Sequence, residues 1–211
     1  MQALRIGILA FTVIVGVVGA AGDPPPSDAD WRWLDDAWRV IDSMMPMSTT
    51  DRTAIVTFRS SQDLHYDVPE RYFEIREVLP GGLPPATLVA TVISPEGKSL
   101  QEQLLTQHLK NPGATPEALQ PQLLVSKSEL SEKDCPELRS RIAKFAKVSI
   151  RVPSLNKIAV HPIARNIQIR TGMGDIHAQL YDENDPLVRW ATRTFDVLNL
   201  CATARSRAAT Q

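Results

Sequence analysis

The 211-residue sequence predicts a single α+β domain, in which an antiparallel sheet of about five or six strands is covered on one face by three or four helices. Three observations predict this class. Several short segments rich in β-branched and aromatic residues are separated by turn-forming residues, which is typical of an antiparallel sheet. Longer segments place apolar residues at three- and four-residue steps, the period of an amphipathic helix. A β-hairpin pattern near residue 172 adds two further strands.

The first predicted helix follows Asp28 or Asp30 as its N-cap and ends at Pro46. Its apolar residues recur at helical spacing, at Trp31, Leu34, Trp38, Ile41 and Met45. Amphipathic helices with this period usually bury their apolar stripe, so we expect the stripe to pack on the core. The alternative is a partner-docking helix, which is favoured by Trp33 because that residue lies off the stripe.

The next part of the chain predicts an antiparallel meander followed by a helix. The three strands are expected over residues 53–59, 72–79 and 87–93. Ser99 and Glu102 form a capping box, which predicts a helix over residues 100–110. Residues 114–134 are polar and contain prolines, so we expect a connection with at most a short helix near 117–119. A connection of this length is either functional or mobile.

Residues 165–181 give the clearest hairpin. A two-residue turn at Gly172-Met173 places three pairs opposite one another: Arg170 with Asp175, Ile169 with Ile176, and Gln168 with His177. A shift of one residue would move the isoleucines to the other face, so the apolar pattern selects this register. One face of the hairpin is therefore expected in the core and the other on a polar surface.

The two cysteines, Cys135 and Cys201, are expected to form one disulfide. Asp134 is the predicted N-cap of a helix that begins near Cys135 and runs to about residue 147. A second helix is expected to begin at Asp185-Pro186 and to end near Cys201, so that two antiparallel helices bring the cysteines together. The rival interpretation, a reactive thiol pair, lacks the CxxC arrangement.

The N-terminal segment predicts export. Residues 1–22 have a basic start, an uncharged apolar run and small residues at its end, which is typical of a signal peptide. We expect a proline-rich linker over residues 23–27, the domain over residues 28–201 and a disordered tail over residues 202–211. The predicted location is periplasmic or secreted. The alternative is an uncleaved N-terminal anchor, the one case in which we expect contact with a membrane.

Composition and motifs exclude several functional classes. The chain carries 23 basic and 24 acidic residues without a long block of either sign, so a nucleic-acid partner is not expected. It contains no HExxH, GxSxG, P-loop, GxGxxG or CxxC motif. Neither a cofactor nor a metal is therefore expected.

The four histidines differ in what their surroundings predict. His65 and Asp67 are more typical of a solvated loop than of a metal site, because no third ligand is near. His108 is placed near a helix C-terminus, where the helix dipole favours a cation. His161 precedes a proline and is expected to end a strand. His177 is the best functional candidate, although a solvated sheet surface has the same pattern.

These observations favour an exported, non-catalytic binding or interaction protein whose partner is an unknown protein or small molecule of the cell envelope. The candidate binding residues are His177, Gln168, Arg170, Gln179, Tyr181 and Trp33. The alternative is a small periplasmic hydrolase that uses His177 or His161 in a site assembled by folding. A pocket that gathers His177 and Arg170 with a carboxylate or serine would favour the hydrolase, whereas a flat polar sheet with an exposed Trp33 would favour the binding protein.

Overall fold

The computed structural model describes residues 28–46, 53–62, 68–79, 85–148, 163–171 and 174–209. Several predicted features lie outside these ranges, namely the signal-like segment, the linker, His65, Asp67, His161 and the Gly172-Met173 turn.

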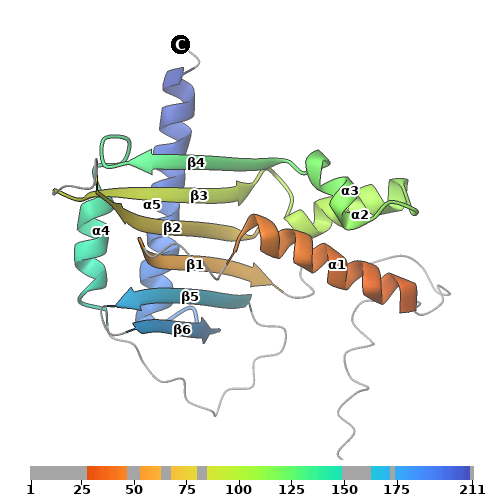
Figure 1. Cartoon of the computed structure of the whole chain (residues 1–211), viewed down its shortest axis with the longest axis horizontal. Coiled ribbons are helices and arrows are strands. Elements are labelled where there is room, and N and C mark those ends of the chain that lie inside the picture. Colours follow the sequence, from red (N-terminus) through yellow and green to blue (C-terminus); the bar gives the residue numbers. More distant parts are fainter. Residues whose placement is uncertain are drawn as a thin grey trace, which may run out of the picture.

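Within the described residues, six strands form one antiparallel sheet (Figure 1). They are β1 (Ala54–Gln62), β2 (Arg71–Val78), β3 (Thr87–Pro95), β4 (Val125–Ser131), β5 (Ile163–Thr171) and β6 (Gly174–Leu180). Their order in the sheet is β4-β3-β2-β1-β5-β6, so the first three strands form the expected meander. The α+β class and the number of strands are confirmed.

Strand β4 is the element that the sequence did not predict. The long connection expected at residues 114–134 contains the short helix α3 (Pro116–Leu119), the 3-10 helix η3 (Gln120–Gln122) and then β4. The strand lies at an edge of the sheet, and Leu130 is its one fully buried residue. An edge strand can form with few buried apolar residues. The sequence of β4 is therefore mostly polar, which is typical of a loop.

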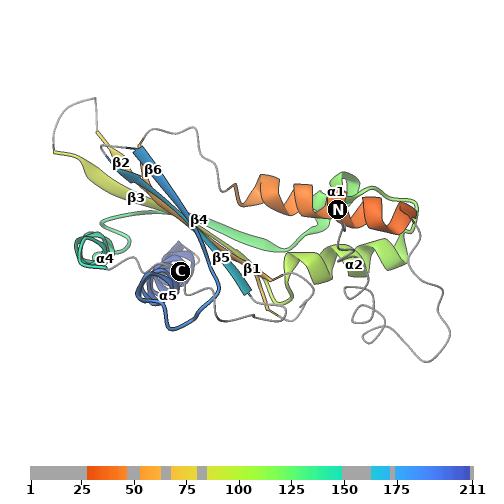
Figure 2. The ribbon, with the colours of Figure 1, turned by 90° about the horizontal axis from the view of Figure 1, so that it is seen from below.

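Two helices, α4 (Leu138–Phe145) and α5 (Pro186–Ala209), pack on one face of the sheet (Figure 2). This face contributes large apolar side chains, including Phe58, Phe73 and Ile167, which are almost completely buried. Helix α5 contributes Leu187, Ala191 and other residues at helical spacing. The main core therefore lies between the sheet and these two helices.

The remaining long helices, α1 (Asp28–Met44) and α2 (Leu100–Lys110), pack with α3 beyond one end of the strands. Figure 2 shows α1 on the side of the sheet opposite α4 and α5. Their smaller apolar cluster includes Ile41 and Leu104 together with Tyr72 and Ile93 of the sheet. The expectation that three or four helices cover one face is therefore corrected to two. An apolar stripe predicts burial but does not specify the partner that buries it.

The ends of α4 and α5 differ from the expected ones. Asp134 does not cap α4, because its carboxylate accepts hydrogen bonds from the backbone N–H (2.8 Å) and hydroxyl (2.7 Å) of Ser131. Helix α5 begins as expected, with Asp185 accepting from the N–H of Leu187 (2.8 Å). It continues through Ala209, so the predicted tail is wrong over residues 202–209. Arg205 anchors this extension to the backbone carbonyl of Glu129.

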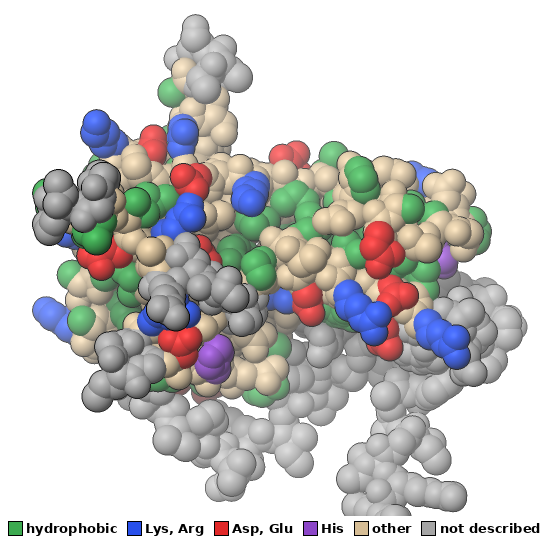
Figure 3. Space-filling view, in the orientation of Figure 1, with side chains coloured by type: hydrophobic (Ala, Val, Ile, Leu, Met, Phe, Trp, Pro, Cys, Tyr) green, Lys and Arg blue, Asp and Glu red, His purple; other side chains and the backbone are tan. Residues whose placement is uncertain are grey.

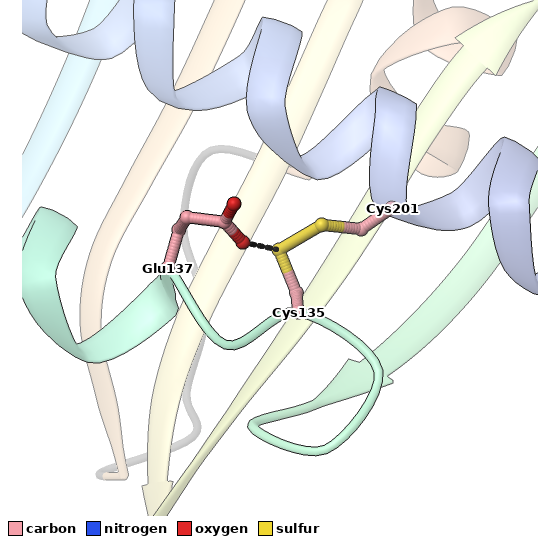
Figure 4. A group of neighbouring side chains, drawn as sticks. All are labelled: Cys135, Glu137 and Cys201. Atoms are coloured by element: carbon pink, nitrogen blue, oxygen red, sulfur yellow. Dashed lines mark hydrogen bonds between the residues drawn. A yellow bond between two sulfur atoms is a disulfide. The ribbon is translucent and has the colours of Figure 1, made fainter.

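The predicted disulfide between Cys135 and Cys201 is present (Figure 4). The two Cα atoms are 5.5 Å apart, and the bridge ties the turn after β4 to the interior of α5. Glu137 approaches Cys135 Sγ at 4.0 Å, a contact in which the bridged sulfur has no proton to donate. The disulfide is consistent with an oxidising, exported location.

Within the described ranges, no helix has both the length and the apolar composition that crossing a membrane requires.

Candidate functional site

The β5–β6 hairpin has the register that the sequence predicts. Gln168 pairs with His177, Ile169 with Ile176, and Arg170 with Asp175. Side chains alternate between the two faces of a strand, so Ile169 faces the core and the polar residues face the opposite side. Ile176 lies on the same face as Ile169, but on the edge strand β6 it is 40 % exposed, so the expected burial of this face is wrong at Ile176.

The polar face extends from this hairpin onto the central strand β1. Strand β1 pairs with β5, which places Thr57 opposite Gln168 and Arg59 opposite Asn166. Two rows of side chains therefore cross β1, β5 and β6. They are Thr57–Gln168–His177 and Arg59–Asn166–Gln179.

A hollow of about 530 Å³ lies where these rows meet α1, and we call it the polar hollow. Its described lining residues are Trp38, Asp42, Arg59, Ser61, Ala164, Asn166, Ile167, His177, Ala178 and Gln179. Figure 3 views the molecule from the side of α1 and shows acidic and basic side chains interspersed over this face of the molecule. The hollow thus combines strand residues from the sheet with two residues of α1.

Charge in the polar hollow is balanced. Arg59 forms an ion pair with Asp42, and the Arg59 side chain is only 8 % exposed whereas that of Asp42 is 59 % exposed. The Arg59 Nε atom is buried and has no hydrogen-bond partner among the described residues. Arg59 and Asp42 are an oppositely charged pair in the described lining and balance each other, so an uncharged ligand fits better than an ion.

The remaining polar side chains supply hydrogen bonds of both kinds. The amides of Asn166 and Gln179 are directly opposed across β5 and β6, and each has a donor and an acceptor group. The two ring nitrogens of His177 add further hydrogen-bonding groups. Trp38 adds an aromatic surface at the α1 side. This arrangement suits a small molecule that carries several hydroxyl or amide groups.

Two predicted site residues, Arg170 and Gln168, are engaged with Asp175 instead. Arg170 donates from Nε (3.0 Å) and Nη2 (3.2 Å) to the two carboxylate oxygens of Asp175. Gln168 is buried and donates to the same carboxylate at 3.1 Å. The hydrogen bonds from Arg170 hold the pKa of Asp175 below its usual value. The sequence predicts that this face is polar, and a solvent-facing surface is the interpretation it favours; Gln168 is instead buried.

The other two predicted site residues lie outside the polar hollow. Tyr181 follows β6, and its side chain is exposed. The Trp33 indole donates to the carbonyl of Ala114 at 3.0 Å and stacks on His108 with ring centroids 4.0 Å apart. Trp33 is one turn from Ala37, which is buried in the α1–α2 cluster, so the idea that it lies off the buried stripe is wrong.

Sequence reasoning missed Arg59, Asp42, Trp38 and Asn166 as site residues. Asn166 shares the alternation of Gln168, so the hairpin pattern contained a signal for it. Arg59 was placed at the end of a predicted strand, but its face depends on pairing with β5 more than 100 residues away. No local pattern specifies such a pairing.

The types of residue that a hydrolase needs are present, but the register separates them. His177 is in register with Thr57, and Ser61 lies four residues further along β1. The Cα atoms of Ser61 and His177 are thus about 13 Å apart along the strand direction and about 10 Å apart across the strands. Neither side chain spans that distance, so Ser61 and His177 do not form a nucleophile–base pair.

One group of described residues has ligand atoms close enough to hold a metal ion, namely Cys135, Glu137 and Cys201 (Figure 4). The disulfide removes both thiolates, which are the forms of cysteine that bind metals. The oxidised protein therefore has no metal site at this group.

Comparison with known proteins adds no assignment: no family model, curated protein or solved structure matches this chain.

Proposed function

We propose that the chain is an exported, non-catalytic binding protein that takes a small uncharged molecule rich in hydroxyl or amide groups in the polar hollow. The observation that carries this proposal is the combination of a hollow of about 530 Å³ with a charge-balanced, hydrogen-bonding lining. Its volume lies within the usual range of small-molecule sites, about 300–1,000 Å³. Asn166, Gln179 and His177 bind the ligand directly, and Trp38 covers one side of it.

The test is a ligand screen by two-dimensional NMR on the disulfide-bonded protein. Monosaccharides, polyols and small amides are added singly, with acetate and a quaternary ammonium ion as charged comparisons. We expect an uncharged compound to shift the resonances of Asn166, Gln179 and His177 saturably. Shifts confined to the charged compounds, or to residues outside the polar hollow, would contradict the proposal.

Export is the second part of the proposal. It is supported by the signal-like composition of residues 1–22 and by the disulfide. We expect the exported chain to begin near Asp23, because the small residues that a signal peptidase requires come directly before it. N-terminal sequencing of protein from the periplasm or the medium checks this. Recovery of intact Met1 in the membrane fraction would instead establish an anchor.

A further inference from the structure

A second hollow lies on the opposite side of the sheet from the polar hollow, between α5 and one end of β1, β2 and β5. Its volume is about 310 Å³, and four arginines line it: Arg71, Arg165, Arg189 and Arg193. Glu183 is the acidic residue among its described lining. We propose that this arginine hollow binds a phosphate group, either as the free ion or as a phosphomonoester.

Arg165 forms the fixed base of the arginine hollow. Its side chain is 8 % exposed. Its Nη1 donates to the carbonyls of Ile163 (3.3 Å) and Tyr181 (3.2 Å), and its Nη2 donates to Glu183 at 2.7 Å. Glu183 is therefore already paired with a buried cation and does not neutralise the other three arginines.

Arg71 approaches the arginine hollow from the start of β2. Its guanidinium lies 5.5 Å from the centre of the Phe195 ring, which orients it against α5. The nearest atoms of Arg71 and Asp196 are 3.7 Å apart, longer than a hydrogen bond. The charge of Arg71 is thus only partly balanced.

The strongest indication that the arginine hollow binds an anion comes from Arg189 and Arg193. They lie four residues apart on α5, and both are exposed. Like charges at this spacing face each other and weaken a helix. Among the described residues neither has an ion-pair partner, and Asp185, one turn before Arg189, is engaged as the helix cap. A bound anion would remove the repulsion between the two arginines.

The number and geometry of these groups favour phosphate over a carboxylate. Arg71, Arg189 and Arg193 are three guanidinium groups that Glu183 does not neutralise, and phosphate has three or four acceptor oxygens with up to two charges at neutral pH. The planar guanidinium fork matches two phosphate oxygens at once. A volume of about 310 Å³ is at the lower end for ligand sites, which suits an ion or a small ester.

The arginine hollow thus differs in chemistry from the polar hollow. In the polar hollow the one arginine is paired with Asp42, whereas here the arginines outnumber the acids. The two proposals rest on different residues, so failure of one leaves the other standing.

The test is calorimetric titration of the disulfide-bonded protein at low ionic strength with inorganic phosphate and with glycerol 3-phosphate. We expect saturable binding of at least one of them. Arg189→Gln and Arg193→Gln should each weaken it by about tenfold or more, because each removes charge-assisted hydrogen bonds. Arg39→Gln is the matched control, since Arg39 is an exposed helical arginine on α1, and it should leave the affinity unchanged.

The two ligands distinguish the source of the phosphate. Equal affinity identifies the free ion, and tighter binding of glycerol 3-phosphate identifies an ester. A titration with anionic phospholipid vesicles is added, and binding of vesicles alone would overturn the proposal in favour of a lipid headgroup. No saturable binding of any of these probes, or binding that Arg189→Gln and Arg193→Gln leave unchanged, overturns the proposal.

A thermal melt in phosphate-free buffer controls for folding. Because Arg193→Gln removes a like-charge contact, the variant should melt at or above the wild-type temperature. Added phosphate should then raise the melting temperature of the wild type but not that of the variant. A variant that melts below the wild type without phosphate would show that the arginine has a structural role, and would also overturn the proposal.

Discussion

Ile169 and His177 lie on opposite faces of the β5–β6 hairpin, and their surroundings differ accordingly. Ile169 is 4 % exposed within the main core, whereas His177 is exposed at the polar hollow. The alternation of apolar and polar residues in the sequence was sufficient to assign these faces, because one face is buried and a slip of one residue would expose it.

The two substitutions should therefore have opposite effects. Ile169→Ala should lower the free energy of unfolding by about 2–5 kcal/mol through lost burial and a cavity. His177→Ala should change it by no more than about 0.5 kcal/mol, since the position is exposed, but should weaken ligand binding. Urea denaturation of both variants measures the difference. A His177 variant that unfolds as easily as a core variant would show that the faces are assigned wrongly.

For other candidate residues, the local sequence did not predict whether the side chain is free to bind a ligand. Trp33 is a residue type that often docks partners, yet here it packs within the protein. Its ring stacks on His108 of α2, and its indole N–H donates to the carbonyl of Ala114. Gln168 is polar but buried: its amide nitrogen donates to Asp175, whereas its Oε1 has no hydrogen-bond partner among the described residues. Whether a polar or aromatic side chain is free depends on neighbours that are distant in sequence.

Among the elements, α2 illustrates how a buried charge can have a structural role. Glu70 is 3 % exposed, and its carboxylate accepts from the backbone N–H groups of Leu100 (2.7 Å) and Gln101 (3.2 Å). The predicted cap is also present, with Ser99 accepting from the N–H of Glu102 at 3.1 Å. Glu70 thus completes the N-terminus of a helix whose cap the sequence identified only in part.

Removing the Glu70 carboxylate should destabilise the protein. Glu70→Ala leaves two buried N–H groups without an acceptor, so the free energy of unfolding should fall by about 1–3 kcal/mol. Glu70→Gln keeps one acceptor oxygen and should cost less. Urea denaturation at neutral pH compares the two variants with the wild type. An alanine variant as stable as the wild type would show that water satisfies these groups.

The same residue predicts a pH dependence. Burial raises the pKa of Glu70 above its usual 4.5, although the backbone hydrogen bonds oppose the shift. The folded protein therefore takes up this proton before the unfolded chain does as pH falls. The contribution of Glu70 to stability is fully present below pH 4.5 and declines as pH rises through the folded pKa. The wild type should thus lose stability relative to Glu70→Gln over this window, and a relative gain would mean that the pKa is lowered.

Elements with a strong local pattern were predictable, and β4 was not. The boundaries of α2 agree with the capping box and the following Asn111-Pro112-Gly113. Strand β4 has no such pattern, because as an edge strand it buries mainly Leu130. Its pairing with β3 supplies the hydrogen bonds that its composition does not indicate.

At the scale of the whole molecule, the disulfide connects parts that lie far apart in the chain. Cys135 and Cys201 are separated by 66 residues, which include α4, β5, β6 and most of α5. Closing a loop of this length stabilises the folded state by about 4 kcal/mol in the chain-entropy model. Cys135 is also fully buried in the main core.

The double variant Cys135→Ala, Cys201→Ala should therefore lose about 2–5 kcal/mol of unfolding free energy. Denaturation with and without a reducing agent provides the control. The reducing agent should destabilise the wild type and leave the double variant unchanged. Equal stability of the two proteins under oxidising conditions would show that the bridge contributes little to the fold.

The α+β class was predictable from local patterns, but the arrangement of layers was not. The sequence indicates which helices are amphipathic, whereas the division into α4 and α5 on one face and α1 to α3 beyond the strand ends depends on long-range packing. The polar hollow depends on that same division, since α1 supplies Trp38 and Asp42. This is why the sequence could indicate His177 and Gln179 on the hairpin but not Trp38 and Asp42 on α1.

The most direct test of the binding account is the affinity of Asn166→Ala and Gln179→Ala for the ligand that the NMR screen identifies, measured beside their stability. Gln122→Ala is the matched control, because Gln122 is an exposed amide outside the polar hollow. We predict that both site variants lose about tenfold or more in affinity. The free energy of unfolding of Gln179→Ala should change by no more than about 0.5 kcal/mol, and the control should bind normally. Unchanged affinity in both site variants would contradict the account, and would leave this face as a solvated sheet surface.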